Sequence, residues 1–138
     1  MTSINDITTA VYRLLVADET LAGLCTVYKG PRRPARAENP SLTLTAKRLG
    51  PGEGGGMWLC DIVTTVYTDL TAAKTPDTVL LDTILCRVRV LLANAEPDIP
   101  GAKAFPLIEG ESGAPGWDAS HDHESGQEQT FGCVFVSL

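Results

Sequence analysis

The sequence lacks the features that mark several large classes of protein. No hydrophobic run approaches the roughly 18 residues that a membrane span needs, and runs such as 90–93 are far shorter. The N-terminus has no basic segment followed by an apolar one, so we expect no secretory signal and no membrane partner. A surplus of Lys and Arg is also missing, since 11 Lys/Arg stand against 17 Asp/Glu. Free nucleic-acid binding is therefore disfavoured, because neutralising phosphates needs that surplus.

The negative charge is concentrated in the second half of the chain. Residues 1–69 hold seven Lys/Arg and seven Asp/Glu, whereas residues 70–138 hold four and ten, so the net charge of −6 arises there. In the first half, a basic tract survives at Lys29, Arg32, Arg33 and Arg36. A length of 138 residues with 43% hydrophobic residues fits a single domain over 1–138 that needs neither metal nor disulfide to fold.

Cysteine is present without a motif. Cys25, Cys60, Cys86 and Cys133 are too far apart for a Cys-x-x-Cys pair, which excludes a zinc or redox motif of that kind. All four lie in apolar surroundings in the sequence, where a free cysteine behaves as a small buried hydrophobe. We expect reduced core thiols. Two disulfides are the alternative, which the missing secretory signal disfavours.

Signatures of catalysis are missing as well. The sequence has no G-x-S-x-G, P-loop or post-strand G-x-G-x-x-G, and its glycine-rich run at 52–56 lies between two expected strands, with no helix after it to hold a phosphate. His121 and His123, with Asp122 and Glu124, could bind a divalent ion. That stretch is a polar loop without a third ligand of settled geometry, so a solvated loop is preferred. We expect no enzyme, no cofactor and no metal.

Two segments have the apolar spacing of helices. The first segment places five apolar residues on one helical face: Ile4, Ile7, Val11, Leu14 and Leu15. Ser3 followed by Asp6 resembles a capping arrangement at its start. The second helix is predicted over 77–93, where Asp77 stands at the beginning and Asn94 marks the end.

Alternating apolar and polar residues predict four strands. Residues 42–47 and 57–68 form a hairpin, and its tip, residues 50–56, holds five glycines. Further strands are predicted at 104–109 and 129–138. The last strand is apolar on both faces, which is typical of a central or covered strand.

The remaining segments are predicted to be long loops. Residues 28–41 contain three prolines, and residues 110–128 are polar and rich in Gly, Ser and Asp. The resulting order is α–β–β–α–β–β. It predicts an α+β fold in which two helices pack on a mostly antiparallel four-stranded sheet, with an extended hairpin and long loops.

Candidate contact residues lie in or beside the irregular segments. They are Lys29, Arg32, Arg33, Arg36, Gly52, Glu53, Gly54, Trp58 and Trp117. The basic arm, residues 29–36, either faces an acidic partner such as the acidic half of a neighbouring copy, or is an ordinary solvated loop. Trp58, beside the hairpin tip, is either core or an interface anchor. Trp117 is the better interface candidate, because a polar loop is a poor place to bury it.

The order of elements and one passage of sequence are shared with a known family. The run 11–15 lies in the first helix, and the passage from Val27-Tyr28-Lys29-Gly30-Pro31 through Pro34 and Pro40 leads into Leu42-Thr43-Leu44. A hairpin, a long helix, a late loop and a C-terminal strand follow. Over nearly its whole length the chain resembles the small tail-terminator or tail-completion proteins of long-tailed bacteriophages.

The resemblance implies a structural role. Such proteins form rings, typically of six copies, that cap the finished tail tube and meet the head-side connector or stopper protein. The implied partners are other copies of the chain, the tail tube protein and the head-side protein, with DNA passing through the lumen without specific binding. The acidic charge is compatible with a wall that repels DNA. The implied location is the virion, at the head–tail junction, after assembly in the host cytoplasm.

Three kinds of protein remain open. The first is the ring protein, for which we expect contacts at the hairpin tip, the basic arm and the loop 111–128. The second is another head–tail connector or a tube-associated subunit; a tube subunit would be richer in strands and a head adaptor richer in helices. The third is an unrelated cytosolic α+β protein that is an enzyme or binds a ligand.

Overall fold

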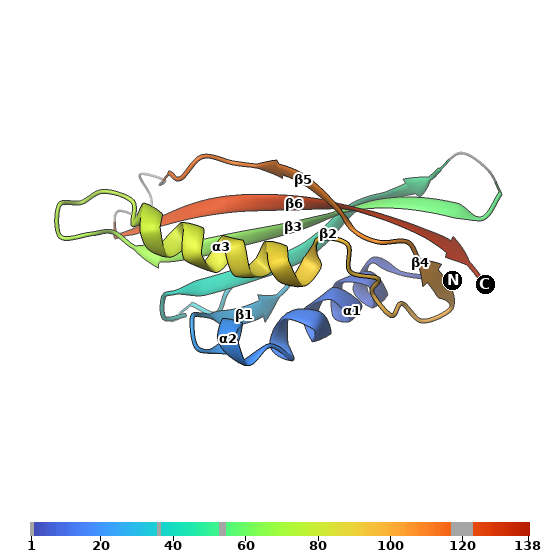
Figure 1. The fold of residues 1–138 in the computed structure, drawn as a ribbon, viewed down its shortest axis with the longest axis horizontal. Coiled ribbons are helices and arrows are strands. Elements are labelled where there is room, and N and C mark those ends of the chain that lie inside the picture. Colours follow the sequence, from blue (N-terminus) through green and yellow to red (C-terminus); the bar gives the residue numbers. More distant parts are fainter. Residues whose placement is uncertain (1, 36, 53–54, 117–122) are drawn as a thin grey trace.

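A long sheet forms the body of the molecule. The computed structural model describes residues 2–35, 37–52, 55–116 and 123–138. Its helices are α1 (Ile4–Val16), α2 (Glu19–Ala22) and α3 (Thr78–Leu92). Its strands are β1 (Thr26–Lys29), β2 (Ser41–Pro51), β3 (Met57–Asp69), β4 (Ala102–Ala104), β5 (Ile108–Ser112) and β6 (Glu124–Ser137). The long strands β2, β3 and β6 run along the longest axis of the molecule (Figure 1).

The strand order confirms part of the predicted fold and corrects the rest. The strands lie in the order β1-β2-β3-β6-β4, and β5 also pairs with β6. The pairing of β1 with β2 is parallel and the others are antiparallel. The α+β class and the mostly antiparallel sheet are therefore confirmed. The expected four strands and two helices were too few, because the described residues form six strands and three helices.

Strand β1 lies at the edge of the segment predicted to be irregular. Its four residues are in register with the first four of β2, and the Thr26 N–H donates to Pro40 O at 3.2 Å. Thr26 and Val27 are β-branched and favour a strand. Four residues are too few to show an alternating pattern. The parallel pairing with β2 therefore determines that this segment is a strand.

The strand predicted over 104–109 is two strands. β4 ends at Ala104 and β5 begins at Ile108. Pro106, between them, has no N–H to donate to a ladder. Leu107 turns its backbone to the chain after α3: its N–H donates to Ala95 O at 2.8 Å and its carbonyl accepts from the Asn94 N–H at 2.9 Å.

β6 begins at Glu124, five residues before the predicted start, so the loop predicted over 110–128 is shorter at both ends. Within the added part, Glu124 and Ser125 are polar but buried. The hydroxyls of Thr68 and Ser125 lie 3.3 Å apart, and Glu124 Oε1 accepts from Arg33 Nη2 at 2.6 Å. Polar side chains with such partners can be buried at little cost, whereas a hydropathy pattern reads them as loop.

The predicted hairpin tip is partly strand. β2 continues through Gly50 to Pro51, after an irregularity in its pairing with β3 between Lys47 and Gly50. An irregularity of this kind admits glycine and proline at positions that would interrupt a regular ladder. The Gly52 N–H then donates to Met57 O at 2.9 Å and closes the turn.

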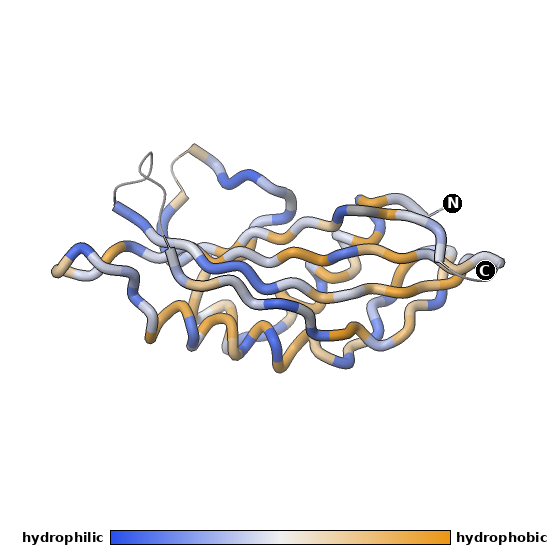
Figure 2. The backbone as a smooth tube through the Cα atoms, turned by 90° about the horizontal axis from the view of Figure 1, so that it is seen from above, coloured by the Kyte–Doolittle hydropathy of each residue, from blue (hydrophilic) through white to orange (hydrophobic). Residues whose placement is uncertain are grey.

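The three helices cover one face of the sheet, which we call the covered face. The predicted cap of α1 is a capping box: the Asp6 N–H donates to Ser3 Oγ at 3.1 Å and the Ser3 N–H to Asp6 Oδ2 at 2.9 Å. Asp77 caps α3 with its side chain, because Asp77 Oδ1 accepts from the Leu80 N–H at 3.2 Å. Figure 2 shows how hydrophobic and hydrophilic residues alternate along the helices. No helix within the described ranges is long and apolar enough to cross a membrane.

The core lies between the covered face and the helices. Its largest fully buried side chains are Phe131, Phe135, Ile7, Leu15, Leu21, Leu42, Leu44, Ile62, Leu81, Ile84, Leu85 and Leu92. β6 carries both phenylalanines between β3 and the short strands β4 and β5, which confirms its prediction as a central strand. We call the opposite side of the sheet the open face, because none of the three helices lies on it.

The cysteines are free, and three of the four are in the core. Burial raises the pKa of Cys25 and Cys133 to about 11 and that of Cys60 to about 12. Cys86 is exposed on α3, so the expectation of a core thiol is wrong for this residue. The buried stripe of α3 runs through Leu81, Ile84, Leu85, Val88 and Leu92, and Cys86 lies outside it.

Candidate functional site

One end of the sheet holds the basic arm through Arg33. The guanidinium binds Glu124 twice, from Nη2 to Oε1 at 2.6 Å and from Nη1 to Oε2 at 3.0 Å. It also lies 3.7 Å from the centroid of the Tyr67 ring. Asn39 Nδ2 donates to Glu124 Oε2 at 2.9 Å. We call these four residues the arm clamp.

The arm clamp is built from the ends of the two longest strands. Glu124 begins β6, opposite Asp69 at the end of β3, and Tyr67 lies two residues before Asp69. Burial alone raises the pKa of Glu124, but the hydrogen bonds from Arg33 and Asn39 outweigh it and leave this pKa below its ordinary value. A bidentate pair of this kind fixes geometry as well as charge. Within the monomer, Arg33 is therefore committed to holding the arm in place.

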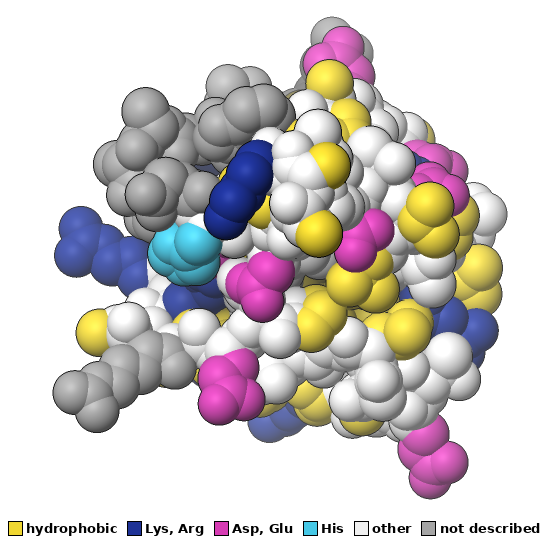
Figure 3. Space-filling model, turned by 90° about the vertical axis from the view of Figure 1, so that its left-hand side faces the viewer, with side chains coloured by type: hydrophobic (Ala, Val, Ile, Leu, Met, Phe, Trp, Pro, Cys, Tyr) yellow, Lys and Arg dark blue, Asp and Glu magenta, His cyan; other side chains and the backbone are white. Residues whose placement is uncertain are grey.

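The other basic residues of the arm differ from Arg33. Lys29 is exposed, and its Nζ donates to Thr9 Oγ1 on α1 at 3.1 Å. Arg32 is exposed and lines a depression of about 570 Å³ together with Arg33, Tyr67 and His123. Figure 3 looks onto this end, where histidine, basic and acidic side chains gather. Arg36 lies outside the described residues, and contact with a partner through these residues stays a prediction.

The hairpin tip and the two tryptophans are placed in part. Gly52 lies at the base of the turn, whereas Glu53 and Gly54 lie outside the described residues. Trp58 is half-buried and packs against the core from the covered face, which favours a core role in the monomer. Trp117 and His121 also lie outside the described part of the chain, so their predicted roles stay predictions.

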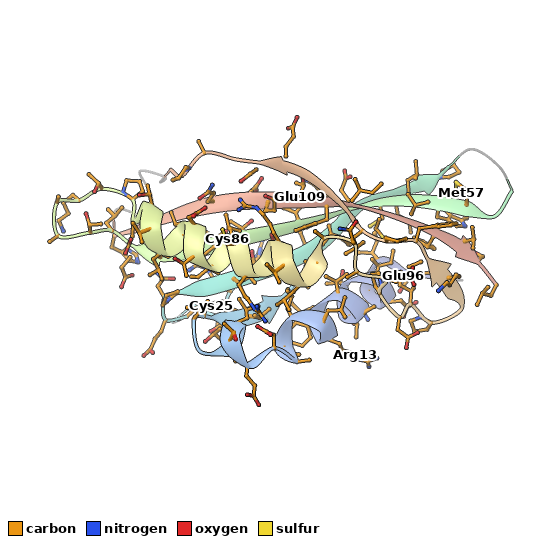
Figure 4. The ribbon with its side chains drawn as sticks, in the orientation of Figure 1. Arg13, Cys25, Met57, Cys86, Glu96 and Glu109 are labelled. Atoms are coloured by element: carbon orange, nitrogen blue, oxygen red, sulfur yellow. The ribbon has the colours of Figure 1, made fainter. Side chains whose placement is uncertain are left out.

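The open face carries an apolar patch that the sequence reasoning did not identify. Its members are Met57, Leu59, Phe105, Val134 and Val136, which we call the hairpin-end patch. The β3–β6 register places Met57 opposite Val136 and Leu59 opposite Val134, and the Phe105 N–H donates to Val134 O at 2.8 Å. Leu59 and Phe105 are 44% and 45% exposed. Figure 4 labels Met57 near the hairpin tip. The sequence carried one sign of this patch. Met57 and Leu59 alternate with Trp58 and Cys60 along β3, so the two pairs lie on opposite faces of the sheet.

Beside the patch the open face is hollowed. Lys47, Asp61 and Gly132 follow one another across β2, β3 and β6, and Ile108 of β5 lies opposite Gly132. Because Gly132 has no side chain, this row forms a depression of about 510 Å³. Across the described residues, no three His, Cys, Asp or Glu side chains gather closely enough to hold a metal ion.

Comparison with known proteins identifies the fold. Neither a protein-family model nor a curated protein sequence matches the chain. Among solved structures, it is similar to a chain of the virion of a native gene transfer agent particle. The TM-score is 0.74 at 18% sequence identity, over 94% of each chain. The protein has the fold of that virion chain. At this identity the likeness extends to the fold alone.

Proposed function

We propose that the protein is a virion structural protein that forms a ring, hexameric in the finished particle, at the end of a phage-like tail. The ring would cap the tail tube and join it to the head-side connector, with no catalytic step. The observation that carries this proposal is the likeness in fold, over nearly the whole of both chains, to a chain of a gene transfer agent virion. The resemblance of the sequence to tail-terminator proteins points the same way.

The shape of the monomer supports an assembly role. The β2–β3 hairpin extends beyond the helices, and the hairpin-end patch leaves apolar area exposed beside it. An exposed apolar patch on a small protein is typical of a surface that a partner covers. The partners proposed are other copies of the chain, the tail tube protein and the head-side protein.

Localisation in purified particles tests the proposal. We expect a label fused to the chain to appear once per particle, at the junction of head and tail, and the copy number to equal one ring. In particles assembled without the protein, we expect tails that fail to join heads. A label spread along the tail or found on the head surface would contradict the junction ring.

A tube-associated subunit is the second candidate, and one observation favours it. The sheet has six strands where four were expected, and a tube subunit would be rich in strands. Copy number separates the two candidates, because a tube repeats its subunit many times along the tail whereas a terminating ring occurs once. We expect the stoichiometry from quantitative mass spectrometry of purified particles to match one ring.

A further inference from the structure

The sheet has two free edges in the described chain. β1 pairs with β2 alone, and β5 pairs with β6 alone, so they lie on opposite sides of the sheet. An edge strand presents backbone N–H and C=O groups that can pair with another strand. β1 and β5 are therefore two places, on opposite sides of the sheet, where a strand of another copy could extend it.

On the β1 edge, the outward backbone groups belong to Val27 and Lys29. The N–H groups of Thr26 and Gly30 donate toward β2, to Pro40 O at 3.2 Å and Leu44 O at 2.7 Å. Because successive residues of a strand alternate in direction, Lys29 directs its backbone groups away from β2. Its side chain is exposed and lies on the covered face, opposite Leu44.

On the β5 edge, the outward backbone groups belong to Glu109. Leu107 uses both of its backbone groups on the side away from β6, where Asn94 and Ala95 bind them. By the same alternation Glu109, two residues on, directs its groups outward, beyond the reach of that segment. Glu109 is opposite Phe131, and its side chain, which lies 3.4 Å from Arg89 Nε, is 48% exposed. Figure 4 labels Glu109 between the ribbons of β5 and α3.

The two edges carry opposite charge. The β1 edge and the arm that follows it expose Lys29 and Arg32, whereas β5 exposes Glu109 and Glu111. Two β1 edges would repel each other, as would two β5 edges, because like charges facing across a pair of strands are unfavourable. A β1 edge and a β5 edge attract. The charges therefore oppose a symmetric dimer and favour head-to-tail contact, the kind that generates rings.

We propose that β5 of one copy pairs antiparallel with β1 of the next, with Glu109 opposite Lys29. This inference rests on the proposed ring and assigns its interface. Both residues direct their backbone groups outward, so they form a hydrogen-bonded pair. Both side chains lie on the covered face, so the sheet continues from copy to copy with its faces aligned. The same register places Gly110, which has no side chain, opposite Tyr28.

Charge reversal tests the pairing on the full-length protein. We expect Lys29→Glu and Glu109→Lys each to weaken self-association at least about tenfold in analytical ultracentrifugation at low salt. The double variant is expected to recover most of the loss, and a mixture of the two single variants to co-assemble. Lys74→Glu and Glu19→Lys are matched controls, because they make the same charge changes at exposed positions that lie on neither edge strand. They are expected to assemble like the wild type.

Cross-linking tests the register. With the exposed cysteine removed by Cys86→Ser, the variant carrying Lys29→Cys and Glu109→Cys is expected to form a ladder of disulfide-linked oligomers under mild oxidation. The matched variant with Lys74→Cys and Glu109→Cys is expected to remain monomeric on the same gel. Circular dichroism of each variant checks that the fold is retained.

The outcomes separate this interface from the ring itself. If the wild type forms rings that the charge reversals leave intact and the cysteine pair does not link, the β1–β5 pairing is wrong and the ring stands. If the wild type remains monomeric at every concentration, and on tails added in vitro, both the ring and the pairing are wrong.

Discussion

The two ends of the β3–β6 ladder are built on opposite principles. At the arm-clamp end, Glu124 and Tyr67 are engaged by Arg33 and Asn39, so the buried charge has its partners within the monomer. At the hairpin end, Leu59 and Phe105 leave nearly half of their surface in solvent. One pair of strands thus has an end that is complete in the monomer and an end whose apolar surface needs a partner. We expect stability to depend on the first end and assembly on the second.

The largest change in stability is expected in the middle of the β3–β6 ladder, between the two ends. Phe131 is fully buried at the centre of β6. Phe131→Ala is expected to lower the free energy of unfolding by about 4 kcal/mol, because it removes apolar contacts and leaves a cavity. Urea denaturation measures the change. A decrease in the free energy of unfolding of less than about 1 kcal/mol would contradict the central role of Phe131 in the core.

The arm clamp sets the next largest effect. Arg33→Ala leaves the Glu124 carboxylate, whose side chain is 6% exposed, without its cation. We expect a loss of about 3 kcal/mol, since breaking a buried pair is more costly than never forming it. Arg32→Ala, at the exposed neighbouring position, is the matched control and is expected to change stability little. Equal effects of the two variants in urea denaturation would contradict the clamp.

Lowering the pH is expected to destabilise the arm-clamp end of the sheet. The pKa of Glu124 lies below its ordinary value of 4.5 in the folded state, so its contribution is complete above that pH and is lost as pH falls below it. Glu124→Gln is therefore expected to be less stable than wild type at pH 7, with the gap closing below about pH 4.5. Denaturation midpoints across this range measure it.

A second carboxylate provides the comparison for that titration. Hydrogen bonds from Arg87 and from the backbone of Leu21 lower the pKa of Asp18 from 3.8 to about 2. For Asp18→Asn, the gap to wild type is therefore expected to close between pH 3.8 and about 2. A gap that is already closed at about pH 5 would contradict the lowered pKa of Asp18.

The hairpin end should show the smallest change in stability. Leu59→Ser is expected to alter the free energy of unfolding by no more than about 1 kcal/mol, because the side chain is already half in solvent. The same variant is expected to weaken self-association or binding to tails. Val79→Ser is the control, since Val79 is 77% exposed on α3, away from the patch. Equal effects of the two variants on assembly would remove the special role of the patch.

The strongly periodic elements could be predicted from sequence. The Ser3–Asp6 cap, the helix after Asp77 and the long hairpin follow from local patterns that the tertiary structure reinforces. β1 could not be predicted, because four residues carry no period and a parallel partner supplies their pairing. The start of β6 could not be predicted for another reason: Glu124 and Ser125 are polar residues that are buried with hydrogen-bond partners distant in sequence.

The contact residues show the same division. The basic composition of the arm was visible, but the sequence could not separate Arg33, which is held by Glu124 from 91 positions away, from Arg32, which is exposed. The hairpin-end patch depends on the register of β3 against β6, and a single-strand pattern does not give that register. Ion pairing and cross-strand register are both properties of the folded chain.

Gly110 on β5 has a consequence for how this protein can change. A Cβ at this position would lie 2.7 Å from Thr130 Oγ1 and 3.2 Å from the Thr130 carbonyl oxygen, so a side chain there requires Thr130 or β5 to shift. Any larger residue would therefore alter how β5 meets β6 at the edge of the sheet. Related chains could thus diverge in which neighbour they accept through one codon, without refolding.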